Sequence, residues 1–191
     1  MNRDTYFIAD THIGFGSRRV VSIRGFGYNW ERHEEAVIQG INRVITSKKT
    51  LYILGDVGSS NDYDHLKKFL AQLNTRKIIL LIGNHDNVKF FKRLKDEHVI
   101  VDFNKFYELK YNKTHITLSH YPLFEWPHFF DNGIHLYGHT HATLEVGWRS
   151  LDVGIDSIGY TPVSLTELLT RMNSVNNVDK YRNKVFLDKR Y

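Results

Sequence analysis

Seven side chains with nitrogen or oxygen donors follow short apolar runs at five places along the 191-residue chain. The clusters are Asp10-Thr11-His12, Gly55-Asp56, Gly83-Asn84-His85-Asp86, Ser119-His120 and Gly138-His139-Thr140-His141. In extended backbone, residues two apart point the same way, so each i, i+2 pair of donors can face one ligand. Two aspartates, one asparagine and four histidines suit Mn, Fe, Zn, Ni or Co better than Ca or Mg. These residue types and spacings favour a centre that holds two metal ions.

Each cluster alone also has an ordinary explanation. An Asp-x-His or Gly-Asp sequence after a strand is a common turn, and His120 before Tyr-Pro could be a buried, hydrogen-bonded histidine. The argument for metal therefore rests on the whole ordered set, in which every cluster follows a predicted strand.

The elements that must position these clusters are predicted strands at Thr5–Ala9, Leu51–Leu54, Ile78–Ile82, Ile116–Leu118 and His135–Tyr137. Helical patterns follow the first three strands. One covers 36–45 and has Asn29 as its N-cap, a second covers 66–73 and is capped by Asn61 or Asp62, and a third covers 88–95. This alternation predicts a parallel α/β sheet, whose strands converge on one crevice at their carboxyl ends.

The second half of the chain is more strand-like. We expect strands at 99–103 and 106–111, an antiparallel pair formed by 143–148 and 151–155, and a short helix at 164–169. The sequence contains no linker or repeat, so we predict a single domain over 1–191, with about 172–191 as a C-terminal tail or edge element.

Composition narrows the function classes. Hydrophobic residues make up 41% and charged residues 25%, which is typical of a soluble globular protein. The chain has no cysteine, so disulfides and thiolate metal sites are excluded. No apolar run is long enough to span a membrane, and the N-terminus lacks a signal-peptide pattern, so we expect a cytoplasmic protein. The net charge of +5 fits a phosphate-bearing partner without requiring one.

The ordered series of clusters resembles the calcineurin-like metallophosphoesterase superfamily over roughly residues 5–160, and in particular its small bacterial and phage phosphoesterases. The resemblance implies an α/β fold, specifically a four-layer α/β/β/α sandwich with two mixed β-sheets flanked by helices. It also implies two metal-ligand sets that share Asp56. The first set is Asp10, His12, Asp56 and His141, and the second is Asp56, Asn84, His120 and His139.

The implied activity is hydrolysis of a phosphate ester. Hydroxide generated between two divalent ions, with Mn favoured, would attack phosphorus, and His85 would act as the general acid. We expect Asp86 to cap the following helix rather than to orient His85. The protein Ser/Thr phosphatase branch is disfavoured because Val57-Gly58-Ser59-Ser60 replaces its Asp-Arg-Gly sequence. Asp152 stands where related small proteins tend to have Asn, and we assign it no role.

Substrate choice is expected to lie in the insertion at residues 14–30, which mixes arginines with aromatics and glycines. Arg18, Arg19 and Arg24 could bind phosphate while aromatic rings stack a base. The alternative is a solvated loop packed by its own aromatics. The aromatic segment 124–130 could likewise hold a nucleoside, although packing is favoured, and we expect His128 and His135 to be structural.

Three functions compete. The favoured one is a phosphodiesterase, rather than a phosphomonoesterase, acting on small nucleotide-like substrates. The second is a nuclease on single-stranded or damaged nucleic acid, in which Lys89, Lys92, Arg93 and Lys95 would extend the basic track of the insertion. The third is a non-catalytic, metal-stabilised scaffold, which the complete ligand set disfavours.

Overall fold

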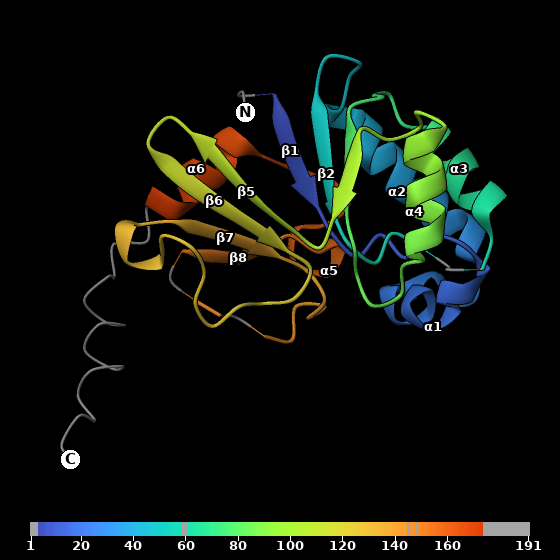
Figure 1. The fold of residues 1–191 in the computed structure, drawn as a ribbon. Helices are drawn as coiled ribbons and strands as arrows, with labels where there is room; N and C mark the ends of the chain where they lie inside the picture. The colour runs from blue at the N-terminus through green and yellow to red at the C-terminus, as the bar shows by residue number, and fades with distance from the viewer. Residues whose placement is uncertain (1–3, 59–60, 145, 148, 174–191) are drawn as a thin grey trace.

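The computed structural model describes residues 4–58, 61–144, 146–147 and 149–173, and it contains two β-sheets (Figure 1). The first sheet has the order β4-β3-β2-β1-β9, in which β1 to β4 are parallel and β9 is antiparallel to β1. Its strands are β1 (Thr5–Ile8), β2 (Thr50–Leu54), β3 (Ile78–Leu81), β4 (Asp102–Asn104) and β9 (Val163–Ser164).

The second sheet has the order β5-β6-β7-β8, with β5 antiparallel to β6 and the other neighbours parallel. Its strands are β5 (Phe106–Tyr111), β6 (Thr114–Ser119), β7 (Ile134–Tyr137) and β8 (Ser150–Asp152). Both sheets are therefore mixed.

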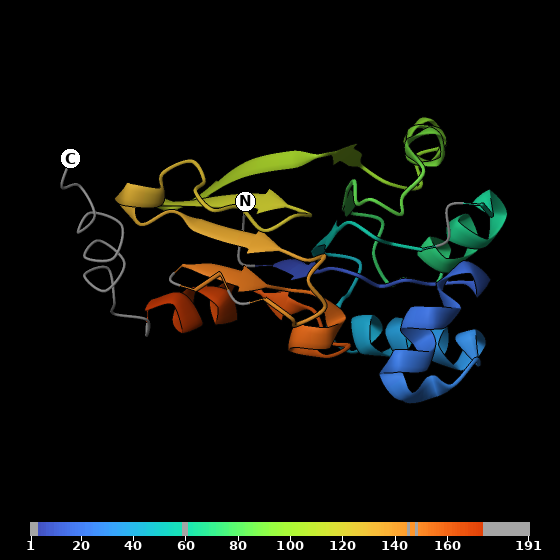
Figure 2. The same ribbon diagram turned by 90° about the horizontal axis from the view of Figure 1, so that it is seen from below.

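Helices flank the two sheets, as Figures 1 and 2 show. Three of them pack on one face of the first sheet: α2 (Trp30–Val44), α3 (Tyr63–Ala71) and α4 (Val88–Asp96). Helix α6 (Leu165–Asn173) packs into the core between the sheets, next to β1 and β9. The shorter helices are η1 (Phe15–Ser17), α1 (Arg18–Val21), η2 (Ser22–Phe26), η3 (Phe129–Asp131) and α5 (Ile155–Ile158). This arrangement confirms the mixed α/β fold with two sheets flanked by helices.

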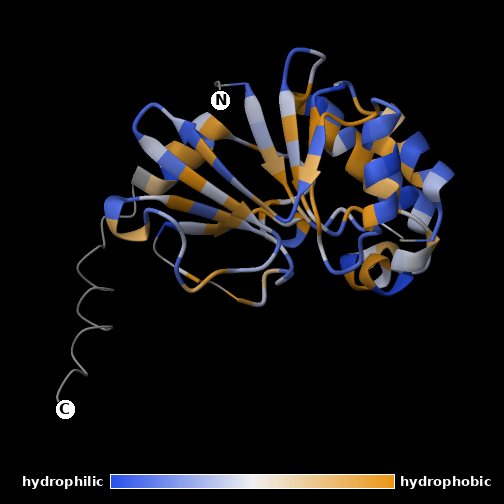
Figure 3. Cartoon of the chain, in the orientation of Figure 1, coloured by the Kyte–Doolittle hydropathy of each residue, from blue (hydrophilic) through white to orange (hydrophobic). Residues whose placement is uncertain are grey.

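The central strands are buried on both faces because their side chains alternate between two cores. Ile8, Ile53 and Leu80 face the helices, whereas their neighbours Phe7 and Leu54 face the second sheet. Each fully buried side chain of this size contributes roughly 1.5–3 kcal/mol relative to exposure. Figure 3 shows hydrophobic residues along these strands, while the helices carry both hydrophobic and hydrophilic positions.

Two of the three predicted N-caps are present. The Asn29 side chain accepts a hydrogen bond from the Arg32 backbone N–H at the start of α2, and Asp62 accepts one from His65 at the start of α3. These bonds satisfy backbone donors that have no partner inside the helix.

The second half departs from prediction in three places. No strand forms at 143–144 or 146–147, and β8 is parallel to β7, so the predicted antiparallel pair is wrong. The apolar alternation there belongs to a loop, in which the Thr143 N–H and hydroxyl both donate to Thr140 O. The predicted strand at 99–103 starts later, as β4 of the first sheet. The final helix is longer than predicted and is preceded by β9.

Two further expectations concern the C-terminal tail and membrane-spanning helices. The predicted tail or edge element at about 172–191 lies outside them, apart from the end of α6. Within the described residues, no helix combines the length and the hydrophobicity that crossing a bilayer demands.

Candidate metal centre

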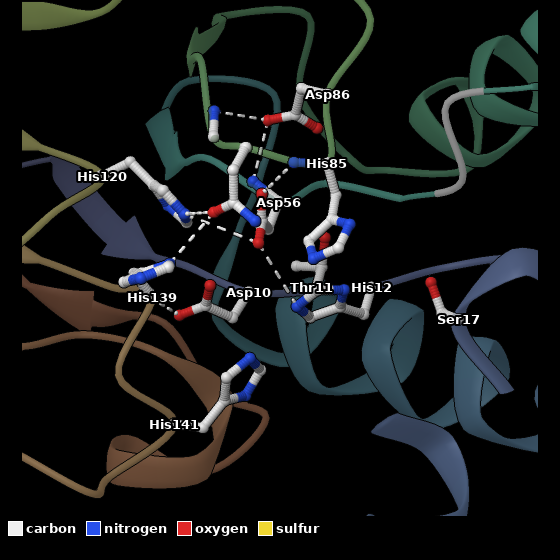
Figure 4. Close-up of polar contacts among 12 residues, drawn as sticks. Asp10, Thr11, His12, Ser17, Asp56, His85, Asp86, His120, His139 and His141 are labelled. Atoms are coloured by element: carbon white, nitrogen blue, oxygen red, sulfur yellow. Dashed lines mark hydrogen bonds and ion pairs between the residues drawn. The ribbon is translucent and has the colours of Figure 1, made fainter. Parts of the chain in front are cut away.

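The predicted donors come together where β1, β2, β3, β6 and β7 end (Figure 4). Parallel pairing of β1, β2 and β3 sets their carboxyl ends side by side, and the β6–β7 pair brings in the later histidines. The donor atoms form two groups, each with all of its members within 4.8 Å of one another. One group is Asp10, His12 and His141, and the other is Asp56, His120 and His139.

Asp56, a member of the second group, also lies next to the first. Its Oδ2 is 3.7 Å from His12 Nε2 and 3.5 Å from His120 Nε2. Its other oxygen, Oδ1, accepts a hydrogen bond of 2.9 Å from the His85 backbone N–H. The carboxylate is thus held by the β3 turn through one oxygen and faces both groups with the other.

Asn84 joins the second group through its side-chain oxygen. Asn84 Oδ1 is 3.0 Å from His120 Nε2 and 3.0 Å from His139 Nδ1. His120 Nδ1 is 2.9 Å from the Leu54 carbonyl, which can only accept, so Nδ1 carries a proton and Nε2 is the ring nitrogen that faces Asn84 and Asp56. All seven predicted ligand side chains therefore lie in one cluster.

The backbone at the cluster adopts an uncommon conformation. Positive φ angles occur at Asp10 (56°), His12 (44°), Asp56 (50°), His139 (70°) and His141 (48°). Left-handed backbone in a non-glycine residue costs of order 1–3 kcal/mol and concentrates at functional sites. Five of the seven predicted ligands are strained in this way, so the surrounding contacts must hold them there.

Three glycines beside the predicted ligands lie so close to these side chains that a Cβ would clash with them. A Cβ at Gly83 would lie 2.2 Å from Asp56 Oδ1, and one at Gly55 would lie 2.5 Å from His120 Nδ1. A Cβ at Gly138 would lie 2.6 Å from Asp10 Oδ2. The glycines that precede three clusters are therefore required by close packing against the donors themselves.

Burial and neighbouring charges set the protonation of the cluster. Burial raises the pKa of Asp10 to about 7 and lowers that of His12 to about 3. Burial also acts to raise the pKa of Asp56, but His120, the His85 backbone N–H and His12 together outweigh it, and the pKa falls to about 2. Asp10 Oδ1 and His12 Nε2 are buried without a hydrogen-bond partner among the described residues. Two buried polar atoms without a hydrogen-bond partner form a site that a cation fits.

The His85 side chain lies at the edge of the cluster and is exposed. Its ring centroid is 5.6 Å from that of His12, and its ring has no hydrogen-bond partner among the described residues. The ring is therefore free to meet a substrate.

Three acidic residues support the cluster, and the sequence did not identify their roles. Asp86 accepts hydrogen bonds from the backbone N–H groups of Gly83, Asp56 and Val57 at 2.8–2.9 Å. The expectation that Asp86 caps α4 is wrong, because Asn87 is the N-cap and accepts from the Lys89 N–H. Asp86 instead ties the β2 and β3 turns together.

The other two acids hold the loop after β7. Asp152 accepts from the Thr140 hydroxyl at 2.6 Å and from the Gly154 N–H at 2.7 Å. Thr140 stands between the two histidines of that loop. Asp156 Oδ2 is 2.7 Å from His141 Nδ1. In the sequence, the only indication of these roles is that both aspartates follow shortly after the last donor cluster.

The insertion is helical, and its three arginines differ. The Arg24 side chain is 4% exposed and bonds Asp156, so the structure does not place it for substrate. Arg18 is exposed and lies over the Phe15 ring at 3.9 Å, and Arg19 is exposed.

Two of the four basic residues on α4 are already paired. Arg93 bonds Glu97 at 2.8 Å, and Lys95 bonds Asp102 at 2.5 Å. The basic track expected of a nuclease is thereby reduced to Lys89 and Lys92 on this helix.

Aromatic side chains border the cluster after β6. Tyr121 is 49% exposed, and its ring centroid is 5.1 Å from that of His120 and 4.6 Å from that of His139. Phe124 is 85% exposed. His135 is fully buried between the hydroxyls of Ser119 and Ser150, consistent with a structural residue.

Comparisons with known proteins agree with this geometry. A model of the calcineurin-like phosphoesterase family matches residues 4–128. An uncharacterized protein of Methanocaldococcus jannaschii is 29% identical, over 85% of this chain and 88% of its own length. The Gene 66 protein of Mycobacterium phage L5 is 27% identical, over 91% of this chain and 96% of its own. A protein of unknown function from Aquifex aeolicus shares the fold, with a TM-score of 0.64 and 22% identity over 87% of this chain and 98% of that one.

Proposed function

The chain belongs to the calcineurin-like phosphoesterase family, and we propose that it hydrolyses phosphodiesters in small, nucleotide-like substrates with two divalent metal ions. The family and the donor groups support a metal-dependent phosphoesterase. The observation that carries the two-metal proposal is the position of Asp56. Its Oδ2 faces His12 on one side and His120 on the other, as a carboxylate shared by two cations would.

The side chains fit such ions. The buried atoms Asp10 Oδ1 and His12 Nε2 lack hydrogen-bond partners among the described residues, and every candidate ligand atom in the cluster is nitrogen or oxygen. Manganese is our favoured metal, with Fe, Zn, Ni and Co as alternatives for this donor set. One ion would be held by Asp10, His12, Asp56 and His141, and the other by Asp56, Asn84, His120 and His139.

Bound there, two cations would neutralise phosphoryl oxygens and lower the pKa of a water molecule to near neutrality. The chain itself supplies the proton that the leaving oxygen needs. His85 is our candidate donor because its ring is exposed and unpartnered, while its backbone N–H is fixed on Asp56. General acid catalysis of this kind contributes roughly 10²–10⁴-fold.

The surroundings favour a diester with an aromatic group. Asn84 and His85 are exposed, so the cluster is open on that side to an extended substrate. Tyr121 presents a half-exposed ring beside His120 and could stack a base. Arg18 and Arg19 remain as candidate phosphate contacts from the insertion.

The test compares bis(p-nitrophenyl) phosphate with p-nitrophenyl phosphate, with the protein first stripped of metal and then supplied with Mn²⁺. We expect turnover only with Mn²⁺, faster on the diester, and lost in Asp56→Asn. Asp102→Asn is the matched control, because Asp102 pairs with Lys95 on the surface. Bound Mn²⁺ without turnover of either compound would exclude the phosphoesterase proposal.

The role of His85 has its own test. His85→Ala should keep both metal ions and lose about 10²–10⁴-fold in kcat on a diester with a poor leaving group. The loss should be smaller with p-nitrophenolate, which leaves without protonation. A variant that loses metal instead would show that His85 is a ligand.

A further inference from the structure

Asp156 contacts one of the predicted metal ligands from outside the cluster. It lies in α5, and its Oδ2 is 2.7 Å from His141 Nδ1. A carboxylate only accepts, so Nδ1 of His141 must carry the proton, and the lone pair is left on Nε2. A histidine that binds metal needs this arrangement, and a carboxylate partner commonly enforces it.

Arg24 holds Asp156 in turn. Its Nε is 2.9 Å from Asp156 Oδ1, and its Nη2 is 2.6 Å from Asp156 Oδ2. The same Nη2 donates to the Asp10 backbone carbonyl at 2.8 Å, and Nη1 donates to His33 Nε2 at 3.1 Å. The guanidinium thus makes a two-pronged bond to one carboxylate and also bonds the backbone of a second predicted ligand.

These contacts join segments that lie far apart in the chain. Arg24 belongs to η2 in the insertion, whereas Asp156 follows the last donor cluster by 15 residues. Figure 1 places α1 and α5 at the end of the first sheet toward which β1 points. The side chain of Arg24 is 4% exposed and that of Asp156 is 20% exposed, so water competes weakly for the pair.

We propose that Asp156 and Arg24 are positioning residues that set His141 and Asp10 for one metal ion and thereby couple docking of the insertion to metal binding. The inference rests on the two-metal centre of the proposed function. Removing the pair should weaken binding of the ion at Asp10, His12 and His141. Binding of the ion at Asp56, His120 and His139 should not change. Because coupling is reciprocal, metal binding should also stabilise the docked insertion.

The experiment titrates Mn²⁺ calorimetrically into the full-length, metal-stripped protein. We expect two binding events in the wild type. In Asp156→Asn, one event should weaken about 10–100-fold, the usual effect of losing a partner of a ligating histidine, and the other should stay unchanged. Arg24→Lys should shift the same event by less, and Asp102→Asn should shift neither. Two unchanged events in Asp156→Asn would overturn the proposal, as would equal weakening of both.

A second measurement follows the insertion directly. Amide hydrogen exchange over residues 15–27 should slow on addition of Mn²⁺ in the wild type and respond less in Asp156→Asn. An equal response in both proteins would overturn the coupling. Neither measurement uses turnover, so the inference stands if Mn²⁺ shows this pattern while no phosphate ester is hydrolysed. Turnover with two unchanged binding events in Asp156→Asn would refute the inference alone.

Discussion

Asp86 offers the sharpest test of how the chain holds its strained ligand turns. The perturbation is Asp86→Ala, which removes an acceptor for three backbone N–H groups, those of Gly83, Asp56 and Val57. All three residues are buried, so their N–H groups would have little access to water. A hydrogen bond to a charged acceptor contributes roughly 1.5–3 kcal/mol, which gives an upper range of about 4.5–9 kcal/mol for three.

The net loss should be smaller, because burial of the Asp86 carboxyl has a cost of its own. Burial raises its pKa to about 6 even though the three N–H groups act to lower it. We therefore expect the free energy of unfolding to fall by about 3–5 kcal/mol in Asp86→Ala. Asp86→Asn keeps one acceptor oxygen, which can serve Gly83 and Asp56, and should lose about 1–3 kcal/mol for the unsatisfied Val57 N–H.

The assay is urea unfolding with a chelator present, so that metal binding does not contribute, followed by Mn²⁺ titration of each folded variant. Both variants should also bind Mn²⁺ more weakly, because the turns that carry Asp56 and Asn84 are no longer tied together. A loss below about 1 kcal/mol in Asp86→Ala, with unchanged Mn²⁺ affinity, would refute the reasoning.

Two further predictions follow from burial and close packing. Burial lowers the pKa of His135 to about 3, so the unfolded chain takes up a proton first as pH falls below about 6.5, and stability must decrease. Between pH 7.5 and pH 5, protonation of this histidine in the unfolded chain should lower the free energy of unfolding by about 2 kcal/mol. His135→Gln should not show this loss. Equal pH dependence of urea unfolding in the two proteins would contradict the prediction. Gly83→Ala places a Cβ 2.2 Å from Asp56 Oδ1 and should weaken Mn²⁺ binding by about tenfold or more. In calorimetry Gly159→Ala, whose added Cβ lies at a positive φ of 79° but meets nothing within 4 Å, should bind Mn²⁺ normally. An equal weakening in both variants would contradict the assignment of the Gly83→Ala effect to the clash with Asp56.

The donors themselves could be found from the sequence because their placement obeys a local rule. A polar residue directly after an apolar strand in a parallel sheet lies at the edge where all such strands end. Asp10, Asp56 and Asn84 follow this rule on adjacent strands, and β6 and β7 repeat it in the second sheet. The strand prediction for the region after His141 was wrong, because the described residues 143–144 and 146–147 do not belong to a strand.

The supporting residues could not be found in this way because their partners are distant in the chain. Arg24 and Asp156 are 132 positions apart in the sequence, and Asp86 is about 30 positions from Asp56 and Val57. By type alone, Arg24 in a Gly-rich insertion resembles a phosphate contact, and Asp86 before a helix resembles a cap. Only the fold shows that both side chains are already engaged with the ligand turns.

The three supporting carboxylates, those of Asp86, Asp152 and Asp156, contact the turns whose backbone is strained. Five predicted ligands adopt left-handed backbone at roughly 1–3 kcal/mol each, and three carboxylates accept hydrogen bonds from the turns that contain them. Asp86 ties the turn of Asp56, Asp152 holds the loop between His139 and His141, and Asp156 fixes the His141 ring. Asp86, which accepts three backbone N–H groups, can thus hold the strained turn of Asp56 in place without itself joining either group of predicted ligands.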